Sequence, residues 1–147
     1  MKNLKNNLAL GLAIIFSLGL VGFYKYNQTT EKAISGKVDY TFTSSQLLKQ
    51  YAEQTSLSDS LYLDKTVSVE GTIKSITPVK KGINVELNTG EEMETVTGTI
   101  DSTQIPEGIV MTEGKNIKLK GRCAGYVEEE MLGLKNVSIV QCSISLN

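Results

Sequence analysis

A run of alternating residues at positions 66–76, TVSVEGTIKSI, constrains the fold of this chain more than any other segment. Val67, Val69 and Ile73 alternate with polar residues, and a period of two is typical of a strand with one buried face. Gly71 interrupts the alternation, and a glycine inside a strand usually marks a bulge or a bend. A long strand bent at a glycine, followed by further short strands, predicts a small closed β-barrel.

Four further strands are predicted, each alternating and each bounded by turn residues. The first strand ends near Pro78, because proline stops ladder pairing. The later strands cover residues 83–87, 93–100, 116–124 and 132–146, and residues 127–131 connect the last two as a hairpin. Residues 105–109, IPEGI, break the β pattern and begin a connector that could hold a helical turn. Five strands with such a connector between the third and the fourth match the OB-fold, a Greek-key barrel.

A short helix is predicted just before the first strand. Thr43 and Gln46 have the spacing of a capping box. The apolar face that follows comprises Leu47, Leu48 and Tyr51, and Ala52 could extend it. This helix is expected to cover one end of the barrel, and residues 56–64 are expected to add a second helical turn.

Residues 8–24, LALGLAIIFSLGLVGFY, carry no charge and approach the length that a membrane-spanning helix needs. Two alternatives follow. As a signal-anchor, the segment keeps Lys2 and Lys5 in the cytoplasm and places the rest of the chain outside, in the periplasm or at the cell surface. As a signal peptide, it is cleaved near Ser17-Leu18-Gly19 and the remainder is secreted. We favour the anchor, because the apolar run continues past Gly19.

The expected organisation is therefore a signal-anchor or transmembrane segment at 1–26, a polar linker at 27–42 and an OB-fold domain at 43–147. The whole chain has a formal net charge of −1. Four of its 15 basic and one of its 16 acidic residues lie before position 35, so residues 35–147 hold 11 against 15, a net charge of −4. This balance shows no electrostatic footprint for a polyanion.

Three segments together resemble a known family. A capped helix is followed by DKTVSVEG at 64–71, EGKNIKLKG at 113–121 and CSI at 142–144. This order resembles the tRNA_anti-like OB-fold family, whose members are bacterial and often exported or membrane-attached. The resemblance covers residues 43–145. It implies kinship with an anticodon-binding barrel, which is ancestry rather than evidence of RNA binding here.

Nucleic-acid binding is the hypothesis that the family name invites, and the residues disfavour it. Single-strand-binding OB domains use a basic groove and aromatic rings on which bases stack, at about 1–3 kcal/mol per base. No Phe, Tyr or Trp lies between Leu63 and Gly125. The fourth strand does carry a basic row, namely Lys115, Lys118, Lys120 and Arg122. A solvated strand face explains this row better than a phosphate track.

Cys123 and Cys142 are the only two cysteines. In an oxidising compartment they could form a disulfide between the fourth and fifth strands, worth about 3 kcal/mol. However, a hairpin centred near Glu129 places Cys123 opposite a residue near Leu134 rather than opposite Cys142. A disulfide and two separate buried thiols therefore remain open as alternatives.

Catalysis and cofactors find no support in the sequence. The chain has no histidine, which removes imidazole catalysis and imidazole metal ligation. The glutamates at 91, 92 and 94 and at 128–130 lack the spacing of a calcium loop and are expected to be solvated charge. No catalytic residue, metal or cofactor is assigned.

We therefore expect a membrane-tethered, exported OB-fold module of the bacterial envelope that binds a protein, glycan or small molecule and is not an enzyme. The candidate ligand face comprises Ile83, Val85, Thr95, Thr97 and Thr99 on the second and third strands. One alternative is a single-stranded nucleic-acid binder. The other is a structural or assembly protein without a ligand site.

Overall fold

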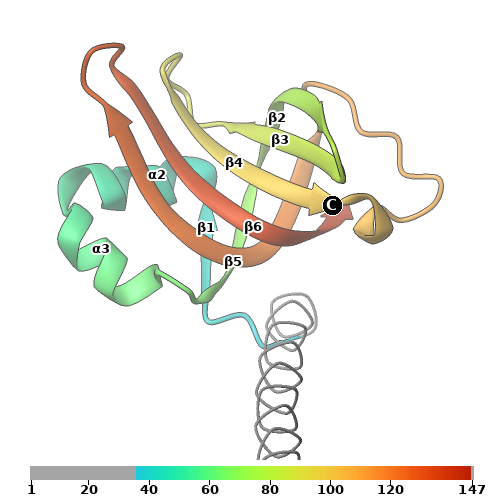
Figure 1. The fold of residues 1–147 in the computed structure, drawn as a ribbon, viewed down its shortest axis with the longest axis horizontal. Coiled ribbons are helices and arrows are strands. Elements are labelled where there is room, and N and C mark those ends of the chain that lie inside the picture. The colour runs from blue at the N-terminus through green and yellow to red at the C-terminus, as the bar shows by residue number, and fades with distance from the viewer. Residues whose placement is uncertain (1–35, 147) are drawn as a thin grey trace, which may run out of the picture. The chain divides into compact units, whose positions relative to one another are not determined.

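The computed structural model describes residues 36–146, which form a mainly β domain (Figure 1). The predicted first strand is a central element of this domain. Along the chain the elements are β1 (Tyr40–Thr43), α2 (Ser44–Glu53), α3 (Thr55–Tyr62), β2 (Thr66–Val79), β3 (Gly82–Asn88), β4 (Glu94–Asp101), the 3₁₀ turn η1 (Ser102–Gln104), β5 (Asn116–Glu129) and β6 (Leu134–Leu146).

The strands form one sheet in the order β1-β2-β3-β4-β6-β5, and an additional pairing of β2 with β5 closes it. Without β1, the ring runs through the predicted first, second, third, fifth and fourth strands and back to the first. The β4–β6 pair is parallel, whereas the other pairs of the ring are antiparallel. This topology confirms the mainly β prediction and is consistent with an OB-like fold.

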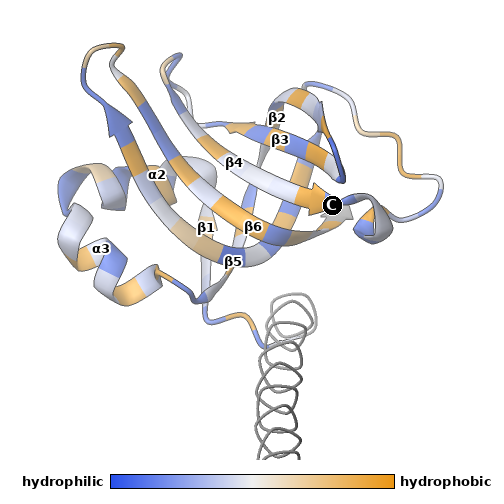
Figure 2. Cartoon of the chain, viewed as in Figure 1, coloured by the Kyte–Doolittle hydropathy of each residue, from blue (hydrophilic) through white to orange (hydrophobic). Residues whose placement is uncertain are grey.

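Alternating side chains of the strands build the core, and Figure 2 shows apolar and polar residues alternating along them. Val67, Val69 and Ile73 of β2 are buried, as their spacing predicts. Their buried neighbours from the other strands are Val85, Leu87, Val96, Ile100, Ile117, Leu119, Cys123, Val137, Ile139, Cys142 and Ile144.

α2 covers one end of this barrel, as predicted. The Thr43 side chain accepts a hydrogen bond from the Gln46 N–H (3.2 Å), and the Gln46 side chain accepts one from the Thr43 N–H (3.0 Å), which completes the capping box. Leu47, Leu48 and Tyr51 are buried beneath the helix, which contacts β2, β3, β4 and β6. Ala52 is exposed instead. α3 supplies the second helical segment that was expected at 56–64.

β1 is a strand that the sequence analysis assigned to the linker at 27–42. It pairs in parallel with the first half of β2. Asp39 fixes its start, because its N–H donates to the Thr66 carbonyl (2.8 Å) and its carboxylate accepts from the Thr66 N–H (2.9 Å). A four-residue strand with a distant parallel partner has no local turn signal, so the folded part begins earlier than predicted.

Several boundaries also differ. β2 continues through Pro78, which lies opposite Ile83 near the end of the β2–β3 hairpin. Antiparallel pairs alternate between bonded and non-bonded positions, so a residue without an N–H is tolerated at the latter. β5 continues to Glu129 and β6 begins at Leu134, which shortens the predicted hairpin connection. The helical turn of the connector is η1, just before residues 105–109.

The predicted transmembrane segment at 1–26 and residues 27–35 of the predicted linker lie outside the described residues. Between positions 36 and 146, no helix combines the length and apolar character that crossing a membrane requires.

A bulge or a bend was predicted at Gly71, and the pairing of β2 changes from β5 to β3 between Thr72 and Ile73, next to this glycine. The register irregularity of β2 lies between Ile73 and Ser75, where the strand pairs with β3. A Cβ atom at position 71 would lie 2.8 Å from Ser44 Oγ and 3.3 Å from Leu87 Cβ. Gly71 therefore lets the first turn of α2 approach the strand closely. The Ser44 hydroxyl cannot swing away freely, because it donates to the Asn88 carbonyl (2.6 Å).

We predict that Gly71→Ala lowers the free energy of unfolding by about 1–3 kcal/mol, because the added methyl group overpacks this contact. Thermal and denaturant unfolding of the full chain measure the change. The matched control is Thr77→Ala on the exposed end of the same strand, which is expected to have a smaller effect. Equal stability of Gly71→Ala and the unmodified chain would contradict the close-approach role.

Candidate functional site

The outer face of β4 carries a row of threonine hydroxyls. Val96 and Ile100 point into the core and are fully buried, so Thr95, Thr97 and Thr99, which alternate with the buried positions, lie on the opposite, partly exposed face. These three threonines are the outward-facing members of the predicted ligand face.

Two asparagines hold these hydroxyls in place. Thr95 and Thr97 both donate to Asn136 Oδ1 of β6, at 3.2 and 2.9 Å. Thr99 donates to Asn84 Oδ1 of β3 at 2.9 Å. The hydroxyl row is therefore part of a hydrogen-bonded network across three strands.

A groove of about 380 Å³ lies over this network. It is lined by Lys74, Glu86, Glu92, Met93, Thr95, Thr97, Leu134, Lys135 and Asn136, and we call it the outer-face groove. Side chains from β2, β3, β4 and β6 meet here because the barrel brings these four strands together.

Charged residues set the polarity of the groove. Lys135 forms an ion pair with Glu94 at 3.0 Å. The hydrogen bond and the charge of Glu94, assisted by the charges of Glu128 and Glu91, raise the pKa of Lys135 above its ordinary value. The Lys74 ammonium donates to the Glu92 main-chain carbonyl at 2.5 Å.

The basic row of β5, together with Lys115 just before the strand, lies outside the groove, and each of the four side chains has an internal contact. Lys118 pairs with Glu70 at 3.6 Å, and Arg122 pairs with Asp64. Lys120 donates to the Gly36 carbonyl at 2.7 Å, and Lys115 donates to the Val110 carbonyl at 3.1 Å. A phosphate track would need these cations free to face a ligand.

The family model described as tRNA_anti-like matches residues 1–137. The chain belongs to the tRNA_anti-like family. No curated protein sequence matches this chain.

Solved structures give distant similarities to this tRNA_anti-like protein. A chain of a replication protein A heterotrimer bound to ssDNA aligns over 56% of the protein and 58% of its own length, at 8% identity and a TM-score of 0.34. An aspartyl-tRNA synthetase from Entamoeba histolytica aligns over 59% of the protein and 20% of itself, at 14% identity and a TM-score of 0.39. A putative aspartyl-tRNA synthetase from Leishmania major Friedlin aligns over 71% of the protein and 20% of itself, at 10% identity and a TM-score of 0.40. The tRNA_anti-like chain thus spans less than two thirds of the length of each.

The structure brings only some residues of the predicted ligand face to the groove of this tRNA_anti-like domain. Thr95 and Thr97 line the outer-face groove, and Thr99 continues the same row beyond it. Val85 is fully buried in the core, and Ile83 packs partly buried against it, so neither lines the groove. The five predicted residues were drawn from both faces of their strands, and Val85 lies on the core face.

Most of the other residues that line the groove were not predicted from the sequence. Asn136 and Lys135 come from the last strand, and Lys74 comes from the first, so only the barrel topology brings them together. Glu86 could have been found, because it lies between the apolar positions Val85 and Leu87 and must face the other way.

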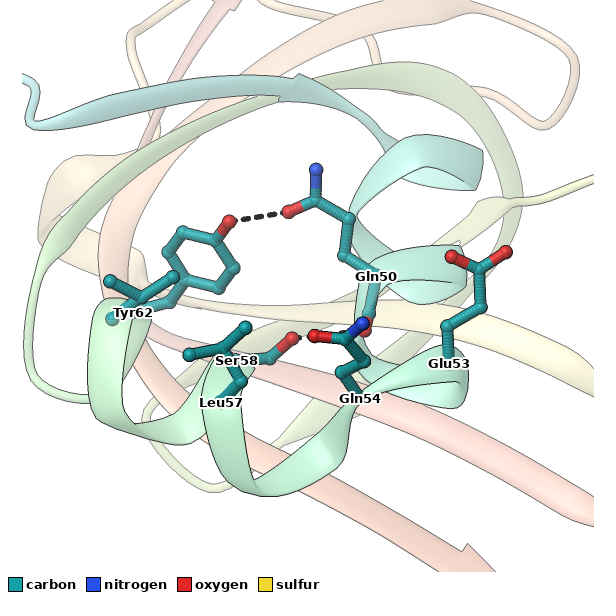
Figure 3. Close-up of a pocket in the computed structure, with 7 residues that line it drawn as sticks. Gln50, Glu53, Gln54, Leu57, Ser58 and Tyr62 are labelled. Atoms are coloured by element: carbon teal, nitrogen blue, oxygen red, sulfur yellow. Dashed lines mark hydrogen bonds between the residues drawn. The ribbon is translucent and has the colours of Figure 1, made fainter.

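A second hollow of about 270 Å³ lies between α2 and α3 (Figure 3). The Tyr62 hydroxyl donates to the Gln50 side-chain carbonyl, and the Ser58 hydroxyl donates to the Gln50 main-chain carbonyl at 2.9 Å. Leu57 and Leu61 also line this hollow. Its polar groups largely bond one another and tie the two helices together, so we place the candidate site in the outer-face groove.

Both cysteines of the tRNA_anti-like domain are buried, free thiols. Cys123 lies opposite Ile139 of β6, whereas Cys142 pairs with Ile100 of β4. Of the two alternatives left open by the sequence, the structure has two separate thiols. The predicted partner of Cys123 near Leu134 was wrong, because Leu134 pairs with Glu129 and the hairpin is centred later.

We predict that both thiols resist alkylation in the folded chain. Burial raises the pKa of Cys142 to about 12, so its thiolate is scarce at pH 8 and becomes abundant only near pH 12. Cys123 has no exposed surface and lies 3.3 Å from the Tyr51 hydroxyl. Intact mass after iodoacetamide treatment should show labelling only in denaturant. A mass change on reduction of the native chain would contradict free thiols.

Proposed function

We propose that this protein is a membrane-tethered binding module that holds a protein, glycan or small-molecule partner in its outer-face groove. The observation that carries the proposal is the groove itself, in which four strands present hydroxyl, amide, carboxylate and ammonium groups together. Side chains on paired strands are fixed in position, and such pre-organisation favours specific binding.

The two alternatives from the sequence are less well supported. A nucleic-acid binder would need free cations and stacking rings, but the basic row of β5 has internal partners, and no aromatic residue lines the groove. A purely structural barrel would have no reason to keep a polar hollow on its outer face. We also propose that the module is not an enzyme, since the hydroxyls of Thr95 and Thr97 donate to an amide rather than to a base.

We predict that Thr97→Tyr weakens ligand capture, because Thr97 lines the groove and the larger ring would occupy part of it, while tyrosine still suits a strand. The full chain in non-ionic detergent is applied to arrays of peptides, glycans and single-stranded oligonucleotides. Binding of the true ligand should weaken at least about tenfold, which corresponds to about 1.4 kcal/mol.

Thr41→Tyr is the matched control, because Thr41 is an exposed threonine on β1 and does not line the groove. It should bind like the unmodified chain. Capture that survives in both variants would place the ligand elsewhere and overturn the proposed site. A nucleic-acid ligand would instead bind with a steep dependence on salt.

The membrane tether is a separate part of the proposal and is supported by the uncharged run at 8–24 behind Lys2 and Lys5. We predict that the full chain, expressed in a bacterial host, stays with the membranes after an alkaline carbonate wash. Ile15→Arg places a charge in the run at a cost of about 2.5–3.5 kcal/mol and should reduce this fraction. Release of the unmodified, full-mass chain by the wash would contradict the anchor, and a mass lacking the first residues would indicate cleavage.

A further inference from the structure

The glutamates around the outer-face groove outnumber its lysines. The carboxylates that line the groove or act on Lys135 belong to Glu86, Glu91, Glu92, Glu94 and Glu128. Only Lys74 and Lys135 oppose them within this set. The groove lining itself holds two glutamates and two lysines, so the excess comes from Glu91, Glu94 and Glu128, which act on Lys135. Within this wider set, five negative and two positive charges leave a net charge of −3.

The lysines do not neutralise this excess. Strand register places Lys135 between Glu94 of β4 and Glu128 of β5. Lys74 bonds a main-chain carbonyl rather than a carboxylate. In the described part of the chain, ion pairs include Glu94 but neither Glu86 nor Glu92. The groove therefore has a negative potential that attracts a cationic ligand.

Exposed apolar side chains flank the same carboxylates. Met93 and Leu134 line the groove and are 53% and 40% exposed. Leu132 and Met131 lie in the β5–β6 turn that leads to Leu134, and Met131 is 95% exposed. Val127 is also exposed, and its register partner is the groove residue Asn136. A partner that covers these side chains removes apolar surface from water, which favours association.

From this combination we infer that the occupant of the outer-face groove is a cationic peptide segment that also carries apolar side chains. The inference rests on the proposed function and names its ligand class. A polyamine would match the charge but would leave Met93 and Leu134 uncovered. A divalent cation fits less well, because no three acidic or thiol side chains within residues 36–146 converge as metal ligands. Polyanions and anionic membranes would be repelled.

The test measures binding of a labelled decapeptide of alternating lysine and leucine to the full chain in non-ionic detergent, with empty micelles as reference. Companion probes are the lysine–serine and glutamate–leucine decapeptides and spermine. The lysine–leucine peptide should bind most tightly, and its affinity should fall as salt rises, because salt screens exposed charges.

Two double variants that remove the same number of charges distinguish the effect of the groove carboxylates from the effect of the net charge of the chain. Glu86→Gln with Glu92→Gln should weaken binding about fivefold, because exposed charge pairs contribute up to about 1 kcal/mol each. Glu107→Gln with Glu113→Gln removes the same charge from the exposed connector between η1 and β5. This control should stay within about twofold of the unmodified chain, since screening limits the reach of distant charges.

Lys135→Gln tests whether misfolding, rather than loss of charge, explains weaker peptide binding in the groove variant. It leaves Glu94 and Glu128 without their cation and should tighten peptide binding about twofold to threefold, which a damaged fold would not do. Equal affinity in the groove double variant and the connector double variant would overturn the inference. Spermine or lysine–serine binding as tight as lysine–leucine binding would also overturn it.

Failure of the inference is distinguishable from failure of the proposed function. If the lysine–leucine peptide does not bind but another array ligand is lost in Thr97→Tyr, the groove is a binding site for a different class, and only the inference falls. If no ligand responds to Thr97→Tyr, the proposed site falls and the inference falls with it.

Discussion

The antiparallel pairing of β2 with β5 converts an open sheet into a barrel, and the other features of the domain depend on that ladder. It joins residues 66–72 to residues 116–122. Closure removes the free edges of the ring, which otherwise invite aggregation. It also directs Val67 and Val69 of β2 and Leu119 of β5 into one core. With the ring closed, α2 needs to cover only one end of the barrel.

The outer-face groove is a consequence of the same closure. β4 and β6 are parallel and lie side by side, although residues 102–133 separate them along the chain. Their register brings Asn136 beside Thr95 and lets it accept from both Thr95 and Thr97. A shift of one residue would direct Val137 outward and Asn136 into the core. The hydrophobic core therefore fixes the polar network on the opposite face, and the geometry of the groove inherits the rigidity of the barrel.

Most of the fold could be predicted from local sequence patterns, whereas most of the site depends on contacts between residues far apart in the sequence. The alternation around Gly71 and the capping box at Thr43 depend on neighbouring residues, so both could be predicted. The pairing of β1 with β2 and the hydrogen bond between Thr97 and Asn136 depend on partners far along the chain, where sequence spacing carries no distance information. Gly71 illustrates the division, because its position inside a strand was predictable, whereas its contact with Ser44 depends on how α2 docks.

Basic and acidic side chains have different places in the domain. The basic side chains of β5 contact Glu70, Asp64 and main-chain carbonyls, so they join segments of the scaffold. The acidic excess lies around the outer-face groove, where Lys135 is only partly exposed between two strands. Exposed ion pairs contribute at most about 1 kcal/mol, so leaving Glu86 and Glu92 without a cation costs the fold little. Because repulsion among the groove carboxylates falls when a cation arrives, the same arrangement that is nearly neutral for stability favours a positively charged occupant.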